Sequence, residues 1–193
     1  MTTNSSRPVI IYISAASDLM AEREALARMI AELPVTLAWR IIQTPLRAEP
    51  LELEAVAAAD LYYLLMGSDI RAPVGLEWLT AQRAGRPVSA FLKQAVGRTP
   101  AGQVFINQTK VAWQPYTDAA DLRRQARQIL VNHLTRHALQ YALTPAELEQ
   151  LVALEEAQAE PAQAAGGQEA GQSAVILSRE RYMPSEGVIV DDS

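Results

Sequence analysis

The stretch GLEWLTAQRAGRPVSAF, residues 75–91, predicts a short helix, a turn and a buried strand in immediate succession. Gly85 suits the position just after a helix, and Pro87 prevents the helix from continuing into the apolar residues that follow. Glu77 is expected in the first turn, where free N–H groups and the helix dipole favour a carboxylate. The stretch therefore predicts a helix with one acidic side chain near its start.

Apolar runs rich in β-branched and aromatic residues lie on both sides of this stretch and alternate with helical patterns. Such runs are typical of parallel strands that helices cover on both faces. The expected strands are residues 8–14, 35–44, 61–66, 88–92 and 110–116, the last at an edge because it contains Pro115. Ser17 or Asp18 is expected to cap the helix that follows the first strand. The alternation predicts a doubly wound α/β domain with a mostly parallel sheet of about five strands.

The C-terminal part predicts further helices and a change in composition. Asp118 or Asp121 is expected to cap a long helix that ends near residue 141. Thr144, followed three residues later by Glu147, has capping-box spacing. Residues 159–173 are low in complexity and lack large apolar side chains. The predicted organisation is an α/β domain at 1–142, a helix at 143–158, a flexible linker at 159–173 and a tail at 174–193.

The predicted tail has two apolar groups separated by charged residues and Pro184. This is the pattern of a docking peptide, and a frayed tail is the alternative.

Charge and composition exclude several function classes. The 17 Lys+Arg against 22 Asp+Glu give a formal charge of −5 without a basic cluster, so no nucleic-acid partner is expected. The absence of cysteine excludes disulfides and thiolate metal sites, and His133 and His137 lack the spacing of a zinc site. No signal peptide or membrane span is predicted, so we expect a cytoplasmic protein without a bound metal.

The carboxyl ends of parallel strands form the edge at which open α/β sheets bind ligands. This edge is expected to present Ser14, Asp69, Arg71 and Glu77, with Tyr12 if its side chain points that way. Neither a Gly-rich phosphate loop nor a GxSxG motif is present. A lone carboxylate suits N-glycosidic bond cleavage, because it stabilises an oxocarbenium-like sugar. A plain N-terminal helix acid is the alternative.

A family resemblance rests on the spacing of Glu77, Ala81, Gly85, Arg86 and Pro87. The pattern resembles the E-x-x-x-A-x-x-x-G-[KR]-P-[VI] segment of nucleoside 2-deoxyribosyltransferases, whose Glu is the nucleophile. It is also similar to the corresponding helix of TIR domains, whose Glu serves NAD cleavage in the enzymatic members.

The segment IYISAASDLMAERE, residues 11–24, resembles the I-Y-x-[AS] first strand of the transferases, whose Tyr lies near that Glu. It is closer still to the TIR-like domain of unknown function that opens many bacterial STAND-type ATPases. The matching residues are Ser14, Asp18, Leu19, Glu22 and Arg23, while Ala15 and Ala16 replace a Ser-Thr pair and the loop is one residue shorter. The resemblance covers residues 9 to about 92 and implies a flavodoxin/TIR-like sheet.

The resemblance also implies roles for individual residues. Glu77 and Tyr12 would be catalytic. The implied ligand-binding residues are Ser14, Ser17, Asp18, Arg23, Gly67, Asp69 and Arg71. Met66 and Arg71 stand where the transferases carry aspartates, so deoxyribosyl transfer is not expected.

Two functions stay open. In the first, the domain binds a nucleotide-type ligand and cleaves the N-glycosidic bond of NAD, as substrate rather than cofactor, in bacterial signalling or defence. In the second, it is a non-catalytic interaction or scaffold module whose late helices and tail bind another protein or a second copy. An enzyme should leave Glu77 reachable with Tyr12, Ser14 or Arg71 converging on it, whereas a scaffold is expected to bury or pair it.

Overall fold

The computed structural model describes residues 7–46 and 49–168, with side chains as far as residue 157. Five parallel strands form one sheet in the order β2-β1-β3-β4-β5. The strands are β1 (Val9–Ala15), β2 (Trp39–Gln43), β3 (Leu61–Met66), β4 (Val88–Lys93) and β5 (Trp113–Tyr116). This strand order is that of a flavodoxin-like α/β fold, as the sequence predicts, and β5 lies at an edge.

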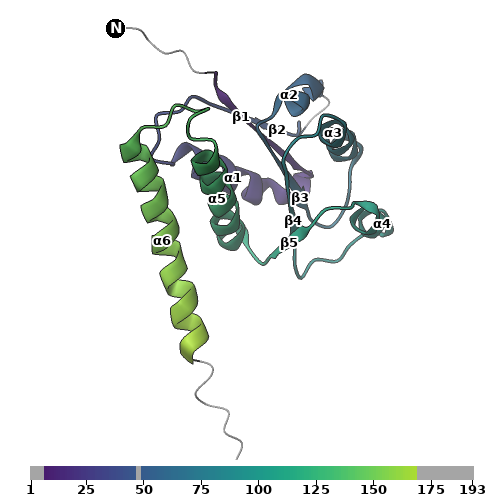
Figure 1. Ribbon diagram of the computed structural model, residues 1–193. Coiled ribbons are helices and arrows are strands. Elements are labelled where there is room, and N and C mark those ends of the chain that lie inside the picture. The colour runs from purple at the N-terminus through teal and green to yellow at the C-terminus, as the bar shows by residue number, and fades with distance from the viewer. Residues whose placement is uncertain (1–6, 47–48, 169–193) are drawn as a thin grey trace, which may run out of the picture. The chain divides into compact units, whose positions relative to one another are not determined.

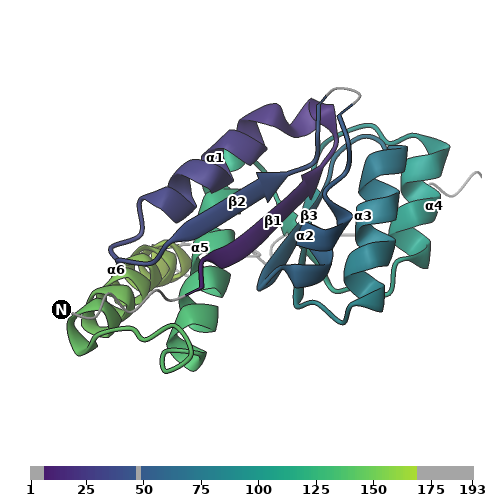
Figure 2. The same ribbon diagram turned by 90° about the horizontal axis from the view of Figure 1, so that it is seen from above.

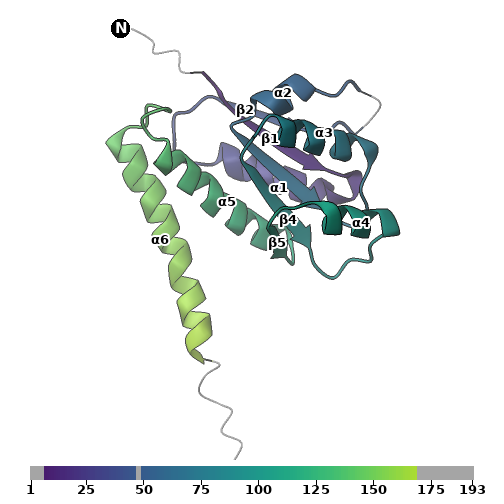
Figure 3. The same cartoon turned by 45° about the vertical axis from the view of Figure 1, so that its right-hand side comes forward.

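Helices cover both faces of the sheet (Figures 1 and 2). They are α1 (Met20–Ala31), α2 (Leu53–Ala58), α3 (Ala72–Arg83), α4 (Pro100–Gln108), α5 (Ala119–Arg136) and α6 (Pro145–Gln168), with a 3-10 turn η1 (Ser17–Leu19) before α1. Figure 3 shows the sheet between a layer of α1 and α5 and a layer of α2, α3 and α4. No helix in the described part of the chain is long and apolar enough to cross a membrane.

The alternation of side chains along β1 divides the apolar core into two clusters. Ile11 and Ile13 belong to the cluster that contains the buried residues of α1 and α5. Tyr12 belongs to the opposite cluster with Tyr62 of β3 and Trp78 of α3. Because successive strand residues point to opposite faces, Ser14 shares the face of Tyr12 and looks toward α3.

The helix α3 begins earlier than the sequence predicts. Ala72 is its first residue and Pro73 lies in its first turn, where the fixed φ of proline favours helix initiation. Glu77 therefore lies in the second turn, and the prediction of a carboxylate in the first turn is wrong.

The predicted cap of the first helix is also wrong. Leu19 is the N-cap of α1, and no side chain caps either η1 or α1. The carboxylate of Asp18 instead accepts hydrogen bonds from Ser68. In contrast, Asp118 caps α5 by accepting hydrogen bonds from Ala120 N and Asp121 N, both at 2.9 Å. The helix ends at Arg136, before the predicted end near residue 141.

The capping box of α6 is present and is extended by a third residue. The Oε2 atom of Glu147 accepts from the N–H and hydroxyl of Thr144, both at 2.8 Å. Its Oε1 atom accepts from the N–H of Thr36 at 2.6 Å and from the Thr36 hydroxyl at 2.7 Å. Glu147 therefore ties the start of α6 to the segment that precedes β2.

The chain divides into two units, Met1–Gln158 and Ala159–Ser193. Helix α6 continues through Gln168, past the end near residue 158 that the sequence predicts. The docking peptide predicted at 174–193 lies outside the described residues.

We expect Glu147→Gln to destabilise the protein by about 1 to 2 kcal/mol near neutral pH, because an amide cannot accept all four hydrogen bonds. The N–H of Thr144, followed by Thr36, lowers the pKa of Glu147 to about 2 from its ordinary 4.5. This stabilisation is present above the unfolded pKa and is lost as the pH falls through the folded pKa. Urea unfolding should show the difference from wild type shrinking between these two values.

The matched control is Glu149→Gln, since Glu149 is exposed on the same helix. A difference between wild type and Glu147→Gln that stays constant down to about pH 2 would contradict the assignment.

Candidate functional site

The carboxylate of Glu77 lies at the centre of a buried hydrogen-bond network. Glu77 is 0% exposed. Its Oε1 atom accepts a hydrogen bond from the Tyr12 hydroxyl at 2.7 Å. Its Oε2 atom accepts from the hydroxyls of Ser14 at 2.5 Å and Thr44 at 2.6 Å. Three hydroxyl groups from β1 and the end of β2 thus converge on one acid of α3.

The positions of these donors follow from the strands. Tyr12 and Ser14 are two residues apart on β1 and therefore share the face that α3 covers. Thr44 continues the pairing of β2 with β1, since its N–H donates to Ile13 O at 3.1 Å. The Thr44 hydroxyl oxygen also accepts from Ala15 N at 3.1 Å. Its own proton is therefore free to point at Glu77.

The ring of Tyr12 is held by stacking. Its centroid lies 5.9 Å from that of Tyr62, and the two ring planes are inclined by 16°. Burial, and secondarily the charge of Glu77, raises the pKa of Tyr12. Tyr12 therefore stays protonated and donates to the carboxylate.

Burial also raises the pKa of Glu77 above its ordinary value. The hydroxyls of Ser14, Thr44 and Tyr12 and the charge of Arg23 act in the opposite direction and offset part of this effect. Carboxyl groups with raised pKa values are found in acid–base sites and in structural networks alike. The network therefore marks a candidate site without deciding its chemistry.

Arg23 connects the start of α1 to the end of β2 beside this network. Its Nε donates to Gln43 Oε1 at 3.1 Å, and its Nη2 donates to the backbone carbonyl of Thr44. Arg23 is only 4% exposed, and its Nη1 has no hydrogen-bond partner among the described residues. It contributes to a pocket of about 390 Å³ lined by Arg23, Gln43, Thr44, Pro45, Leu46 and Glu49. This pocket adjoins the Glu77 network through Thr44.

Asp18 links the segment after β1 to the segment after β3. Asp18 Oδ2 accepts from the Ser68 N–H at 3.0 Å and from the Ser68 hydroxyl at 2.6 Å. Partial burial opposes ionisation, but these bonds lower the pKa of Asp18. A Cβ atom on Gly67 would lie 2.7 Å from Asp18 Oδ2, so this close approach needs a glycine. Asp18 and Gly67 therefore join two loops and do not contact Glu77.

Three other predicted site residues also lie apart from Glu77. Asp69 accepts a hydrogen bond at 2.5 Å from Thr99, the residue that caps α4. Arg71 is the exposed N-cap of α3 and forms no ion pair within the described part of the chain. Ser17 lies half-buried in η1. Of the predicted residues, the fold brings Tyr12 and Ser14 into contact with Glu77 and places Arg23 one residue away, at Thr44.

Thr44 and Gln43 belong to this site although no sequence motif marks them. Gln43 is the last residue of β2 and Thr44 follows it, and two polar residues directly after Ile41 and Ile42 were the available signal. The sequence also does not predict the ion pair between Lys93 Nζ and Glu22 Oε1, at 2.5 Å. This pair neutralises a buried acid of α1.

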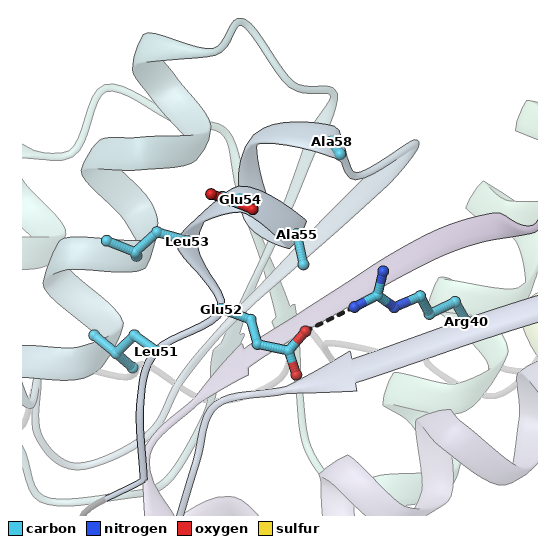
Figure 4. Close-up of a pocket in the computed structure, with 7 residues that line it drawn as sticks. All are labelled: Arg40, Leu51, Glu52, Leu53, Glu54, Ala55 and Ala58. Carbon is cyan, nitrogen blue, oxygen red and sulfur yellow. Dashed lines mark hydrogen bonds and ion pairs between the residues drawn. The ribbon is translucent and has the colours of Figure 1, made fainter.

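A larger pocket of about 580 Å³ lies beside α2 (Figure 4). Arg40 forms an ion pair with Glu52 at 2.8 Å on its wall, and both side chains are more than half exposed. Exposed pairs of this kind stabilise little. No group of three or more His, Cys, Asp or Glu within residues 7–46 and 49–168 has the arrangement of a metal site.

No protein-family model matches this chain, and no curated protein matches its sequence. The function of this chain is therefore inferred from the geometry of the Glu77 network and its surroundings.

The raised pKa of Glu77 predicts a specific pH dependence. The folded protein holds this proton more tightly than the unfolded chain, so stability falls as the pH rises from the ordinary value of 4.5 through the raised value. Glu77→Gln has no such proton to lose. We expect wild type to lose stability relative to Glu77→Gln as the pH rises, with the difference measured by urea unfolding from about pH 4 to about pH 8.

Glu54→Gln on the exposed side of α2 is the control and should follow wild type at every pH. If the difference in stability between wild type and Glu77→Gln stays constant with pH, the Glu77 carboxyl titrates alike in the folded and unfolded states. That result would contradict the prediction.

Proposed function

We propose that this chain is a TIR-like, deoxyribosyltransferase-like α/β domain that binds a nucleotide-type ligand beside Glu77. The observation that carries this proposal is the convergence of the Tyr12, Ser14 and Thr44 hydroxyls on one buried carboxylate at the carboxyl ends of β1 and β2. Open α/β sheets bind their ligands at this end. The pocket that Thr44 shares is the nearby space for such a ligand.

The proposed reaction is cleavage of the N-glycosidic bond of NAD. A carboxylate near the anomeric carbon stabilises the oxocarbenium-like sugar or attacks it as the nicotinamide leaves, and water then completes hydrolysis. Tyr12 would orient this carboxylate. Glu77 is 0% exposed, which is the arrangement expected of a scaffold rather than of an open enzyme site. This proposal therefore takes the described conformation as a resting one, and cleavage requires a second conformation that exposes the acid.

The test is release of nicotinamide from NAD by purified protein at high concentration over hours. We expect slow release by wild type and a loss of at least about 100-fold in Glu77→Gln, the size of effect that removing a catalytic acid commonly has. Tyr12→Phe keeps the stacked ring and should lower the rate less. Equal release by wild type and Glu77→Gln would overturn the catalytic role of Glu77.

A second candidate function is a non-catalytic interaction module, and it is favoured by the surface of α3 and α4. Leu76 and Leu79 of α3 and Val104 of α4 are large apolar side chains that remain exposed. Between the two helices lies a groove of about 540 Å³ whose lining includes Trp78, Leu79 and Phe105. Exposed apolar patches of this kind mark interaction surfaces. Among the described side chains of the later part of the chain, Val152 of α6 is exposed, and Leu139, between α5 and α6, is 99% exposed.

This second function predicts self-association through α3 and α4. We expect sedimentation velocity to detect a dimer of the wild type as concentration rises, and Leu79→Glu to weaken it by at least about tenfold, because a charge would be buried in the contact. Met20→Glu adds the same charge at an exposed apolar position of α1 and should leave association unchanged. A wild type that stays monomeric would count against this surface as a homodimer contact.

A further inference from the structure

Arg23 is a buried cation whose hydrogen bonds are incomplete. Its Nε and Nη2 donate to neutral oxygens, those of Gln43 and Thr44, and its Nη1 has no partner among the described residues. No carboxylate in the described part of the chain lies within ion-pair distance of it. Glu22, the preceding residue, is also buried but is paired with Lys93 at 2.5 Å. Of these two buried charges of α1, only one is neutralised by contact.

This arrangement leaves the Arg23 guanidinium without a contacting counter-charge among the described residues at the end of β2. A guanidinium group does not give up its proton in proteins, so Arg23 cannot become neutral as a buried lysine can. The carboxyl group whose charge acts on Arg23 is that of Glu77, and burial disfavours its ionisation. A buried charge without a counter-charge is costly, and an anion that entered the site would relieve that cost.

The pocket beside Arg23 has a size and lining that suit a phosphorylated sugar. Its volume of about 390 Å³ lies within the range of small-molecule sites. An arginine N–H donates a charge-assisted hydrogen bond to a phosphate oxygen, and Nη1 is the nitrogen of Arg23 that lacks a partner among the described residues. Because Nη1 is buried, this contact requires the guanidinium to shift toward the pocket. Glu49, exposed on the same pocket, offers acceptor oxygens that suit sugar hydroxyl groups.

We propose that the pocket at Arg23 is a subsite for the phosphoryl group of a nucleotide, with Arg23 as the residue that binds it. This inference rests on the proposed binding of a nucleotide-type ligand and assigns the phosphate end of that ligand to the pocket outside β2. Free inorganic phosphate offers the same chemistry and is the other source that the experiment must distinguish.

The experiment is calorimetric titration of the full chain with AMP, adenosine and inorganic phosphate as three separate probes. A charge-assisted contact with Arg23 should make AMP bind at least about tenfold more tightly than adenosine. Arg23→Met should abolish this preference. Because Arg23 is buried and that variant can unfold, a second pair of variants is placed at Leu46, an exposed residue of the pocket lining.

Leu46→Glu puts a negative charge in the pocket, and Leu46→Gln is its uncharged match. We expect Leu46→Glu to reduce the preference for AMP over adenosine, and Leu46→Gln to retain it. Phosphate binding with this same dependence on Leu46, without nucleotide binding, would support the subsite and overturn the nucleotide proposal. Equal affinity for AMP and adenosine would overturn the subsite while nucleotide binding stands. Binding of none of the three probes would overturn both.

Discussion

The structure depends on keeping one acidic side chain hydrogen-bonded where water does not reach it. A buried carboxylate without donors would cost several kcal/mol, so the three hydroxyls around Glu77 are a condition for packing α3 against β1. Tyr12 and Ser14 are positioned by β1, and Thr44, directly after β2, is positioned by its backbone hydrogen bond to Ile13. The network therefore couples the register of β1 and β2 to the position of α3. A shift of one of these elements would change the hydrogen bonds of the other two.

The carboxyl edge of the sheet has two halves with different character. Between β1 and β3, where flavodoxin-like folds change direction and usually bind ligands, the Asp18 carboxylate holds the Ser68 loop in place. Outside β2, the pocket at Arg23 stays open and carries an unsatisfied cation. The ligand position proposed above therefore lies at the β2 edge of the sheet rather than at its centre.

The sequence predicted the strands well because parallel strands buried on both faces leave long apolar runs. The resemblance to the transferases implied that Tyr12 lies near Glu77, and alternation along β1 places Ser14 on the same face as Tyr12. The sequence failed where partners are distant in the chain: Asp18 looks like a helix cap, yet Ser68 competes for it successfully. Thr44 was missed because its role depends on which strand lies beside β1, which local pattern does not reveal. The start of α3 was missed because the predicted helix began after Gly75 and left out Pro73, which lies in the first turn.

Thr44 connects Glu77 to Arg23. Its hydroxyl donates to Glu77, while its carbonyl accepts from Arg23, so one residue holds both the buried acid and the cation of the pocket. Displacement of Arg23 toward an anion would shift Thr44 and alter the proton affinity of Glu77. By thermodynamic reciprocity, the protonation state of Glu77 would change the affinity for that anion to the same extent. If the proposed anion binds, occupancy of the pocket and proton uptake by the core would therefore be linked through Thr44.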